Sequence, residues 1–318
     1  MDSDIQTIVQ AFHENSLALK KPLENEYFKR TAALLYALNG RKIDLERIRF
    51  YYDLIKRKTG WLSAFRWNYH LFLSAMLALE DEGEKKFAEV LATYQDLKNE
   101  GFSPNPYLVL TSWFIVKKSE EGSRGFLLKK TRLVYEGMKN YHRFLTSPRY
   151  CLMAAVFGTS EIDYALLLKK AEKHYQNLKK EFSPGWRLLE TSHALCVYED
   201  YFDPEKKLLS LKDLLNRKGI KIHRGQGLPF LGLLATLPAD PETIAGQVEK
   251  AYLGLLEYKT FRSILVPKQE MLMYACTIVA WTYAEMDPQL SVNLKDLAFA
   301  RLLQSISLMS AENRQSNE

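Results

Sequence analysis

Glu190 and His193 have the spacing that comes closest to a metal-binding pattern in this sequence. A Glu-x-x-His pair places both side chains on one face of a helix, and two such pairs on facing helices hold a di-iron centre. No other histidine of the chain has Glu three residues before it. Because the second half of that motif is missing, we expect ordinary core or surface roles for Glu190 and His193, and no metal or cofactor.

Gly225-Gln-Gly227 is the only glycine pattern that resembles a nucleotide-binding loop. A dinucleotide fingerprint needs a preceding strand, a third glycine and a βαβ unit, and none of these surrounds Gly225. The sequence also lacks a Walker loop and the Gly-x-Ser-x-Gly elbow of hydrolases. We therefore predict a turn at Gly225–Gly227.

No obvious pair of carboxylates stands out in the sequence, although several lie in predicted turns between helices. A glycosidase built on an α/α barrel needs two carboxyl groups that face a central cleft, roughly 5–9.5 Å apart. The candidates are Glu80, Asp81, Glu199, Asp200 and Asp203. Their spacing does not identify a pair, so an enzyme on a closed helical toroid stays an alternative without assigned catalytic residues.

Residues 101–185 carry a clear excess of Lys and Arg over Asp and Glu, in a chain of formal net charge +6. The candidate phosphate-binding stripe consists of Lys117, Lys118, Lys129, Lys130, Lys169 and Lys170. Such a stripe can bind nucleic acid or an acidic partner. Glutamates interrupt it, so a solvated outer face is the favoured interpretation and nucleic-acid binding is an alternative.

Aromatic and cationic residues alternate at one predicted turn. The cluster consists of Trp61, Phe65, Arg66, Trp67 and His70. Trp, Tyr and Arg are the residues most enriched at the energetic centres of protein interfaces. Packing of an irregular turn is the simpler explanation, and a partner surface is the functional alternative.

A tyrosine followed three residues later by an apolar residue recurs about every 40 residues, which is the signature of a repeat array. The copies are Tyr51…Leu54, Tyr94…Leu97, Tyr135…Met138, Tyr175…Leu178 and Tyr252…Leu255, with a degenerate copy at Lys212…Leu215. Residues three apart share one face of a helix. We expect these residues to lie in the core.

Two kinds of helix alternate along the repeats. The first kind is apolar on all sides and is predicted at 67–80, 106–118, 149–158, 186–199, 227–236 and 269–286. The second kind is amphipathic and is predicted at 84–99, 125–143, 161–181, 204–217 and 241–258. A helix that is apolar all round must pack between neighbours, so the amphipathic helices should cover it from outside. Asp44, Asp203-Pro204 and Asp240-Pro241 are predicted helix starts.

Composition is typical of a folded protein without a membrane span. The chain has 318 residues, of which 47% are hydrophobic, and no uncharged apolar run is long enough to cross a bilayer. The acidic N-terminus does not resemble a secretory signal. Cys151, Cys196 and Cys276 are scattered in apolar stretches, which indicates buried thiols. We expect a cytoplasmic protein with no membrane contact.

Three segments resemble a known family. They are Leu35–Asp44, Thr59–Arg66 and Met273–Trp281. The chain is similar, over roughly residues 5–285, to all-helical bacterial proteins of comparable length that are catalogued only as a domain of unknown function. The resemblance implies the helical fold and no activity.

We therefore predict an all-α fold of tandem helical hairpins that form an α-solenoid, with a closed α/α toroid as the other arrangement. The prediction is one domain over 1–309, comprising a cap and first hairpin at 1–60, repeats at 61–286 and a capping helix at 287–309. Residues 310–318 are expected to be a disordered tail. The leading functional hypothesis is a non-enzymatic scaffold whose groove binds a protein or peptide, and the oligomeric state is left open.

Overall fold

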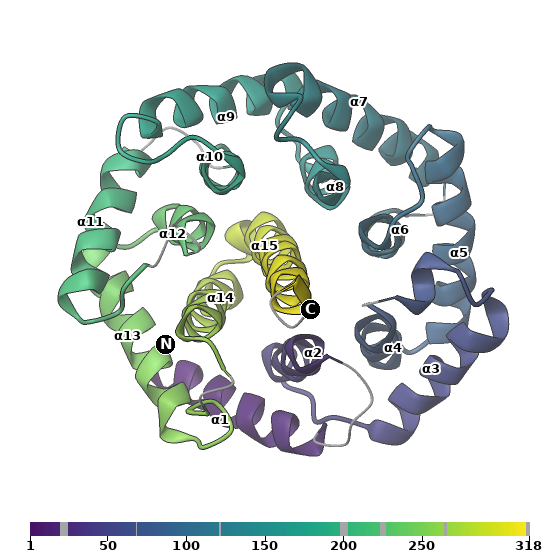
Figure 1. The fold of residues 1–318 in the computed structure, drawn as a ribbon, viewed down its shortest axis with the longest axis horizontal. Helices are drawn as coiled ribbons and strands as arrows, with labels where there is room; N and C mark the ends of the chain where they lie inside the picture. The colour runs from purple at the N-terminus through teal and green to yellow at the C-terminus, as the bar shows by residue number, and fades with distance from the viewer. Residues whose placement is uncertain are drawn as a thin grey trace. The chain divides into compact units, whose positions relative to one another are not determined.

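The computed structural model describes residues 1–19, 25–67, 69–120, 122–197, 203–222, 227–263 and 266–315, and within these ranges all regular structure is helical. The helices before the middle of the chain are α1 (Asp2–Ala18), α2 (Glu26–Leu38), α3 (Leu45–Lys58), α4 (His70–Leu79), α5 (Gly83–Asn99), α6 (Pro106–Lys118), α7 (Arg124–His142) and α8 (Cys151–Thr159). The later helices are α9 (Tyr164–Leu178), α10 (Trp186–Leu195), α11 (Pro204–Arg217), α12 (Leu228–Ala235), α13 (Pro241–Glu257), α14 (Lys268–Met286) and α15 (Pro288–Gln315). Figure 1 labels them along the ribbon, and the all-α prediction is confirmed.

Side-chain caps begin several helices where the sequence predicts them. The Asp44 carboxylate accepts a hydrogen bond from the Arg47 amide at the start of α3 (2.9 Å). Asp203 and Asp240 cap α11 and α13 in the same way, each followed by a proline at the first helical position. Aspartate satisfies amide groups that have no partner within the helix, and proline has no amide to satisfy there.

The two kinds of helix differ in burial as predicted. In α4, α8 and α12 nearly every residue is buried, α6 is buried over most of its middle, and α14 is buried from Gln269 to Ala284. In α5, α7, α9, α11 and α13 only one stripe is buried. The stripe includes the repeated tyrosines and the apolar residue three positions later, so their predicted core position is confirmed.

The described chain divides into two compact units. Unit 1 comprises residues 1–13 and 162–303, and unit 2 comprises residues 14–161 and 304–318. In unit 2, α3 packs on α4, α5 on α6 and α7 on α8, while α2 packs on α4 and α6 on α8. In unit 1, α9 packs on α10, α11 on α12 and α13 on α14. Each amphipathic helix therefore packs on the apolar helix that follows it.

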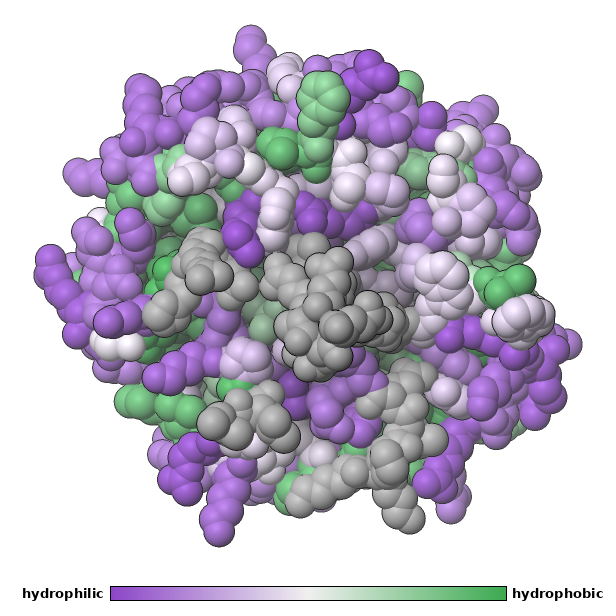
Figure 2. All heavy atoms as spheres, viewed as in Figure 1, coloured by the Kyte–Doolittle hydropathy of each residue, from purple (hydrophilic) through white to green (hydrophobic). Residues whose placement is uncertain are grey.

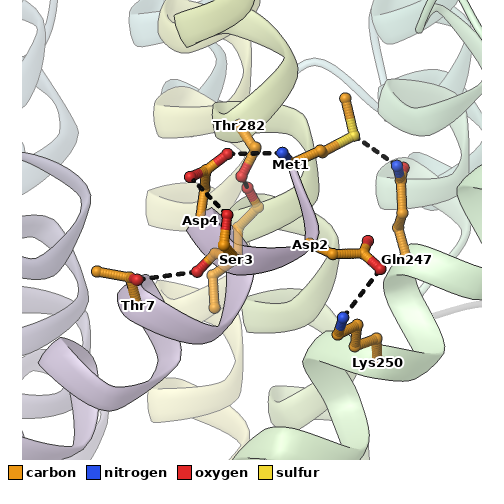
Figure 3. Close-up of polar contacts among 9 residues, drawn as sticks. Met1, Asp2, Ser3, Asp4, Thr7, Gln247, Lys250 and Thr282 are labelled. Atoms are coloured by element: carbon orange, nitrogen blue, oxygen red, sulfur yellow. Dashed lines mark hydrogen bonds and ion pairs between the residues drawn. The ribbon is translucent and has the colours of Figure 1, made fainter.

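The start of α1 packs against the last repeats of unit 1. The Phe12 ring lies 4.5 Å from that of Phe261 and 5.1 Å from that of Tyr274, measured between ring centroids. Figure 3 shows the polar contacts of the first turn, where the Asp2 carboxylate pairs with Lys250 of α13 (2.9 Å). The first 13 residues of the chain belong to the unit that holds α13 and α14.

Two boundaries differ from the expected ones. The helix predicted from residue 67 begins at His70, because residues 64–66 form a short 3-10 helix, η1 (Ala64–Arg66), immediately before it. Helix α15 continues to Gln315, beyond the residue at which the capping helix is predicted to end. The three cysteines are buried and unpaired, as expected, and burial raises the pKa of Cys151 and Cys196 to about 12.

Candidate interaction surface

Arg66 closes the end of α3. Its Nη2 donates hydrogen bonds to the carbonyl oxygens of Lys56 and Thr59, and its Nε donates to the Thr59 hydroxyl (3.3 Å). The last carbonyl groups of a helix have no intrahelical partner, and a guanidinium satisfies them while its charge balances the negative helix end. The Arg66 side chain therefore fixes the turn that follows α3.

Phe65 and His70 belong to the core rather than to the surface. Phe65 packs edge-on against Phe87 and Tyr94, with ring centroids 6.0 and 5.0 Å apart. His70 stacks on Tyr52 at 3.6 Å, and its Nε2 lies 2.9 Å from the Tyr52 carbonyl oxygen. Burial lowers the pKa of His70 to about 4 because the charged imidazolium loses its hydration. Neither side chain is placed to contact a partner.

Trp61 and Trp67 are the members of the predicted cluster that face solvent. Trp61 is 79% exposed, Trp67 is 55% exposed, and Leu62 between them is 68% exposed. We call these three residues the tryptophan surface. In the space-filling view, hydrophilic residues dominate the visible surface and hydrophobic ones form small separate groups (Figure 2). The tryptophan surface places three large exposed side chains within one short segment.

The tryptophan surface follows a basic helix end. Residues 54–67 contain no Asp or Glu, and the last turn of α3 consists of Lys56, Arg57 and Lys58, all of them exposed. The Lys56 ammonium lies 4.5 Å from the Tyr52 ring centroid. An apolar centre with cations beside it is complementary to an apolar segment flanked by carboxylates. Leu62 and this basic turn are not among the residues predicted from the sequence, although the Gly60-Trp-Leu62 run after a helix end is a usable signal.

The predicted lysine stripe is divided between the two units. In unit 2, Lys117 pairs with Glu80, and Lys118 lies near the Phe114 ring. Lys130 donates a hydrogen bond to the Ser160 carbonyl oxygen (2.9 Å), and Lys129 is exposed. In unit 1, Lys169 is exposed and Lys170 is half-buried. Lys130 and Lys170 are thus less exposed than Lys129 and Lys169, whereas Lys118 is exposed like Lys117. Nucleic-acid binding by the stripe stays a prediction.

The candidate carboxylates occupy structural positions where they are described. Glu80 pairs with Lys117, Asp203 caps α11, and Asp81 is exposed. Glu199 and Asp200 lie outside the described residues, as do Gly225 and Gln226 of the predicted glycine turn. Among the described residues, no group of three or more His, Cys, Asp or Glu side chains converges in the way metal ligands do.

Glu190 and His193 lie in α10 in the interior of unit 1. The Glu190 carboxylate faces the Arg301 guanidinium of α15 at 4.0 Å, and both side chains are fully buried. The sequence pattern predicts an apolar stripe in this last helix and does not single out Arg301. A buried charge needs an opposite charge beside it, and Glu190 and Arg301 supply that charge to each other.

The helical packing and the burial pattern define an all-α protein built from repeated helix pairs. The chain belongs to the family described as "Protein of unknown function (DUF4003)", whose model matches residues 13–305. Membership confirms the resemblance seen in the sequence.

A bacterial relative is likewise described as uncharacterized. The chain is 24% identical over 238 residues to "Uncharacterized protein YeaA" of Bacillus subtilis (strain 168), an alignment that covers 72% of this chain and 71% of the relative. No solved structure matches the chain. No described helix is both long enough and apolar enough to cross a membrane.

Proposed function

We propose that this protein is a non-enzymatic scaffold that binds a protein segment through the tryptophan surface. The observation that carries the proposal is the joint exposure of Trp61, Leu62 and Trp67 beside a basic helix end. Burying these side chains against a partner removes a large apolar area from water, which is the main source of affinity at an interface. The partner segment presents apolar side chains flanked by Asp or Glu.

The turn is held in shape before any partner binds. Arg66 fixes the end of α3, and Phe65 anchors the chain to α5 through Phe87 and Tyr94. A preformed surface loses little conformational entropy on association. Arg66 and Phe65 therefore hold in place the segment that carries the exposed Trp61 and Trp67.

The test begins with capture by a photo-crosslinking amino acid at position 62, with the same group at exposed Phe144 as the control. A partner captured only from position 62 is then purified, and its affinity is measured for the unchanged chain and for two double variants. We expect Trp61→Ala/Trp67→Ala to weaken binding at least about tenfold relative to the unchanged chain. The matched variant Phe126→Ala/Phe144→Ala, which removes two exposed aromatic rings elsewhere in unit 2, should bind normally. Equal losses in both double variants would contradict the proposal.

The α-solenoid form of the array, open or closed as a toroid, and a cytoplasmic location are parts of this proposal. The pairing of helices within each unit supports a repeat array. Small-angle scattering distinguishes the forms, because a compact chain of this length has a radius of gyration of roughly 20 Å and an open arc has a clearly larger one.

A further inference from the structure

A cavity of about 500 Å³ opens in unit 1 between the end of α11, one face of α13 and the start of α14. Its size falls in the range of small-molecule sites. It is lined by residues 218–221, by four residues of α13 and by Lys268 and Leu272 of α14. We call it the lysine pocket. The tryptophan surface belongs to unit 2, so a ligand site in the lysine pocket is independent of the proposed function.

The charge of the lysine pocket is positive. Lys218, Lys221 and Lys268 line it, against a single carboxylate, Glu249. Glu249 already pairs with Lys218 at 2.6 Å, and within the described residues no carboxylate pairs with Lys221 or Lys268. Lys268 is also the first residue of α14, where helix amide groups add positive potential. Among the described residues, two cations and a helix start therefore surround the pocket without a counter-charge.

The other wall of the pocket is apolar. Tyr252, Leu253 and Leu256 lie on one face of α13, and Leu272 of α14 completes the wall. Leu253 is 53% exposed. The residue after the repeated tyrosine is polar in the three preceding clear copies, where it is Gln95, Glu136 and Gln176. An exposed leucine at this position is thus specific to the helix that lines the pocket.

Tyr252 brings a polar hydroxyl group to the lysine pocket. The Tyr252 side chain is 9% exposed, and its hydroxyl makes no hydrogen bond to any described residue and is open to water. The equivalent tyrosine of an earlier repeat is closely enclosed, since a Cβ on Gly83 would lie 2.2 Å from the Tyr51 hydroxyl. The Tyr252 hydroxyl therefore offers the pocket a hydrogen-bond donor beside its apolar wall.

We propose that the lysine pocket binds a small amphipathic organic anion. Lys221 and Lys268 contact its anionic head, and the Tyr252 hydroxyl donates a hydrogen bond to it. The leucine wall contacts an apolar tail. This contact covers Leu253 and so removes apolar surface from water.

The test is isothermal titration calorimetry on the full chain with octyl phosphate, kept below the concentration at which it forms micelles. Two control ligands are octanol, which has the apolar tail without the anionic head, and inorganic phosphate, which has the anionic head without the tail. We expect saturable one-to-one binding of octyl phosphate, and binding of either half at least about tenfold weaker, because both walls contribute. If inorganic phosphate bound as tightly as octyl phosphate, the proposal of an amphipathic ligand would be wrong and the pocket would be an anion site only.

Two matched double variants assign the site. Lys221→Gln/Lys268→Gln should weaken octyl phosphate binding at least about tenfold, because charge-assisted contacts to the head are lost. Lys173→Gln/Lys180→Gln makes the same charge change at exposed positions of unit 1 outside the pocket and should bind normally. Leu253→Gln, which installs a residue found in earlier repeats, should weaken octyl phosphate and leave inorganic phosphate unchanged. No saturable binding, or equal affinities in both double variants, would overturn the proposal.

Discussion

At the scale of single residues, polar side chains in this protein mainly complete the ends of helices and the joints between them. Arg66 satisfies carbonyl groups at the end of α3, and Glu205 of α11 accepts hydrogen bonds from His174 and Asn177 at the end of α9 (2.9 Å each). In the sequence these residues look like ordinary charged positions. Their roles arise because a helix end exposes backbone groups that need a partner.

Replacing Arg66 by Ala should destabilise the fold by about 1–3 kcal/mol, because the Lys56 and Thr59 carbonyls lose a charged donor. The measurement is urea unfolding followed by tryptophan fluorescence. Arg57→Ala is the control, since Arg57 is exposed in the same helix turn and its loss should change stability by no more than about 0.5 kcal/mol. Equal effects of the two substitutions would show that the carbonyl contacts contribute nothing.

Glu205 should make stability depend on pH in the acid range. The hydrogen bond from His174 is the main cause that lowers the pKa of Glu205 to about 2, below the 4.5 of an unperturbed Glu. The carboxylate therefore contributes its full stabilisation above pH 4.5 and loses it as the pH falls towards 2.

We expect Glu205→Gln to be less stable than the unchanged chain by about 1–3 kcal/mol at pH 6, and the gap to narrow between pH 4.5 and pH 2. Urea unfolding at several pH values measures the gap. Glu181→Gln, at an exposed position of the same unit, should show no such gap. A gap for Glu205→Gln that stays constant with pH would contradict the assigned pKa.

At the scale of helices, a glycine at the start of α5 allows α3 to approach closely. Gly83 begins α5, and a Cβ there would lie 2.2 Å from the Tyr51 hydroxyl and 2.6 Å from the Leu77 carbonyl oxygen. The repeated tyrosine of α3 therefore determines which residue can begin α5. Backbone atoms cannot move away as a flexible side chain can.

Gly83→Ala should destabilise the protein by about 1–3 kcal/mol through overpacking, despite the higher helix propensity of alanine. Gly246→Ala in α13 is the matched control, because nothing lies within 4 Å of its added methyl group. We expect that control to gain about 0.5–1 kcal/mol. Adding Tyr51→Phe to Gly83→Ala should recover part of the loss, and a loss that is unchanged would mean that the Leu77 carbonyl is the main obstacle. Thermal unfolding by circular dichroism measures all three variants.

At the scale of the whole molecule, the apolar helices pack against helices of neighbouring pairs. A single pair cannot cover an all-apolar helix such as α8 or α12, so isolated pairs should not be stable. The sequence predicts one cooperative array, and the described chain divides into two compact units. The number of unfolding transitions therefore distinguishes one cooperative array from two separate units.

We expect one unfolding transition, with calorimetric and van't Hoff enthalpies that agree. Differential scanning calorimetry gives both values, and urea unfolding followed separately by circular dichroism and by tryptophan fluorescence gives the same test at constant temperature. Two resolved transitions would contradict a single array and would indicate that units 1 and 2 fold independently.

The sequence by itself determined where the helices lie. Proline, aspartate caps and the spacing of apolar residues act within a few positions of the chain, so α6 and α11 begin and end where the pattern predicts. It also separated apolar from amphipathic helices, because burial follows from how much of the circumference is apolar. Composition and periodicity were sufficient for the all-α class.

Only the tertiary structure decided which side chains are available to a partner. Trp61 and Phe65 belong to one short aromatic run, yet one is exposed and the other packs on α5, 22 residues further along the chain at Phe87. The lysine pocket combines Lys221, Leu253 and Lys268 from three separate segments. Such placements depend on packing between residues far apart in the sequence, and no local pattern encodes them.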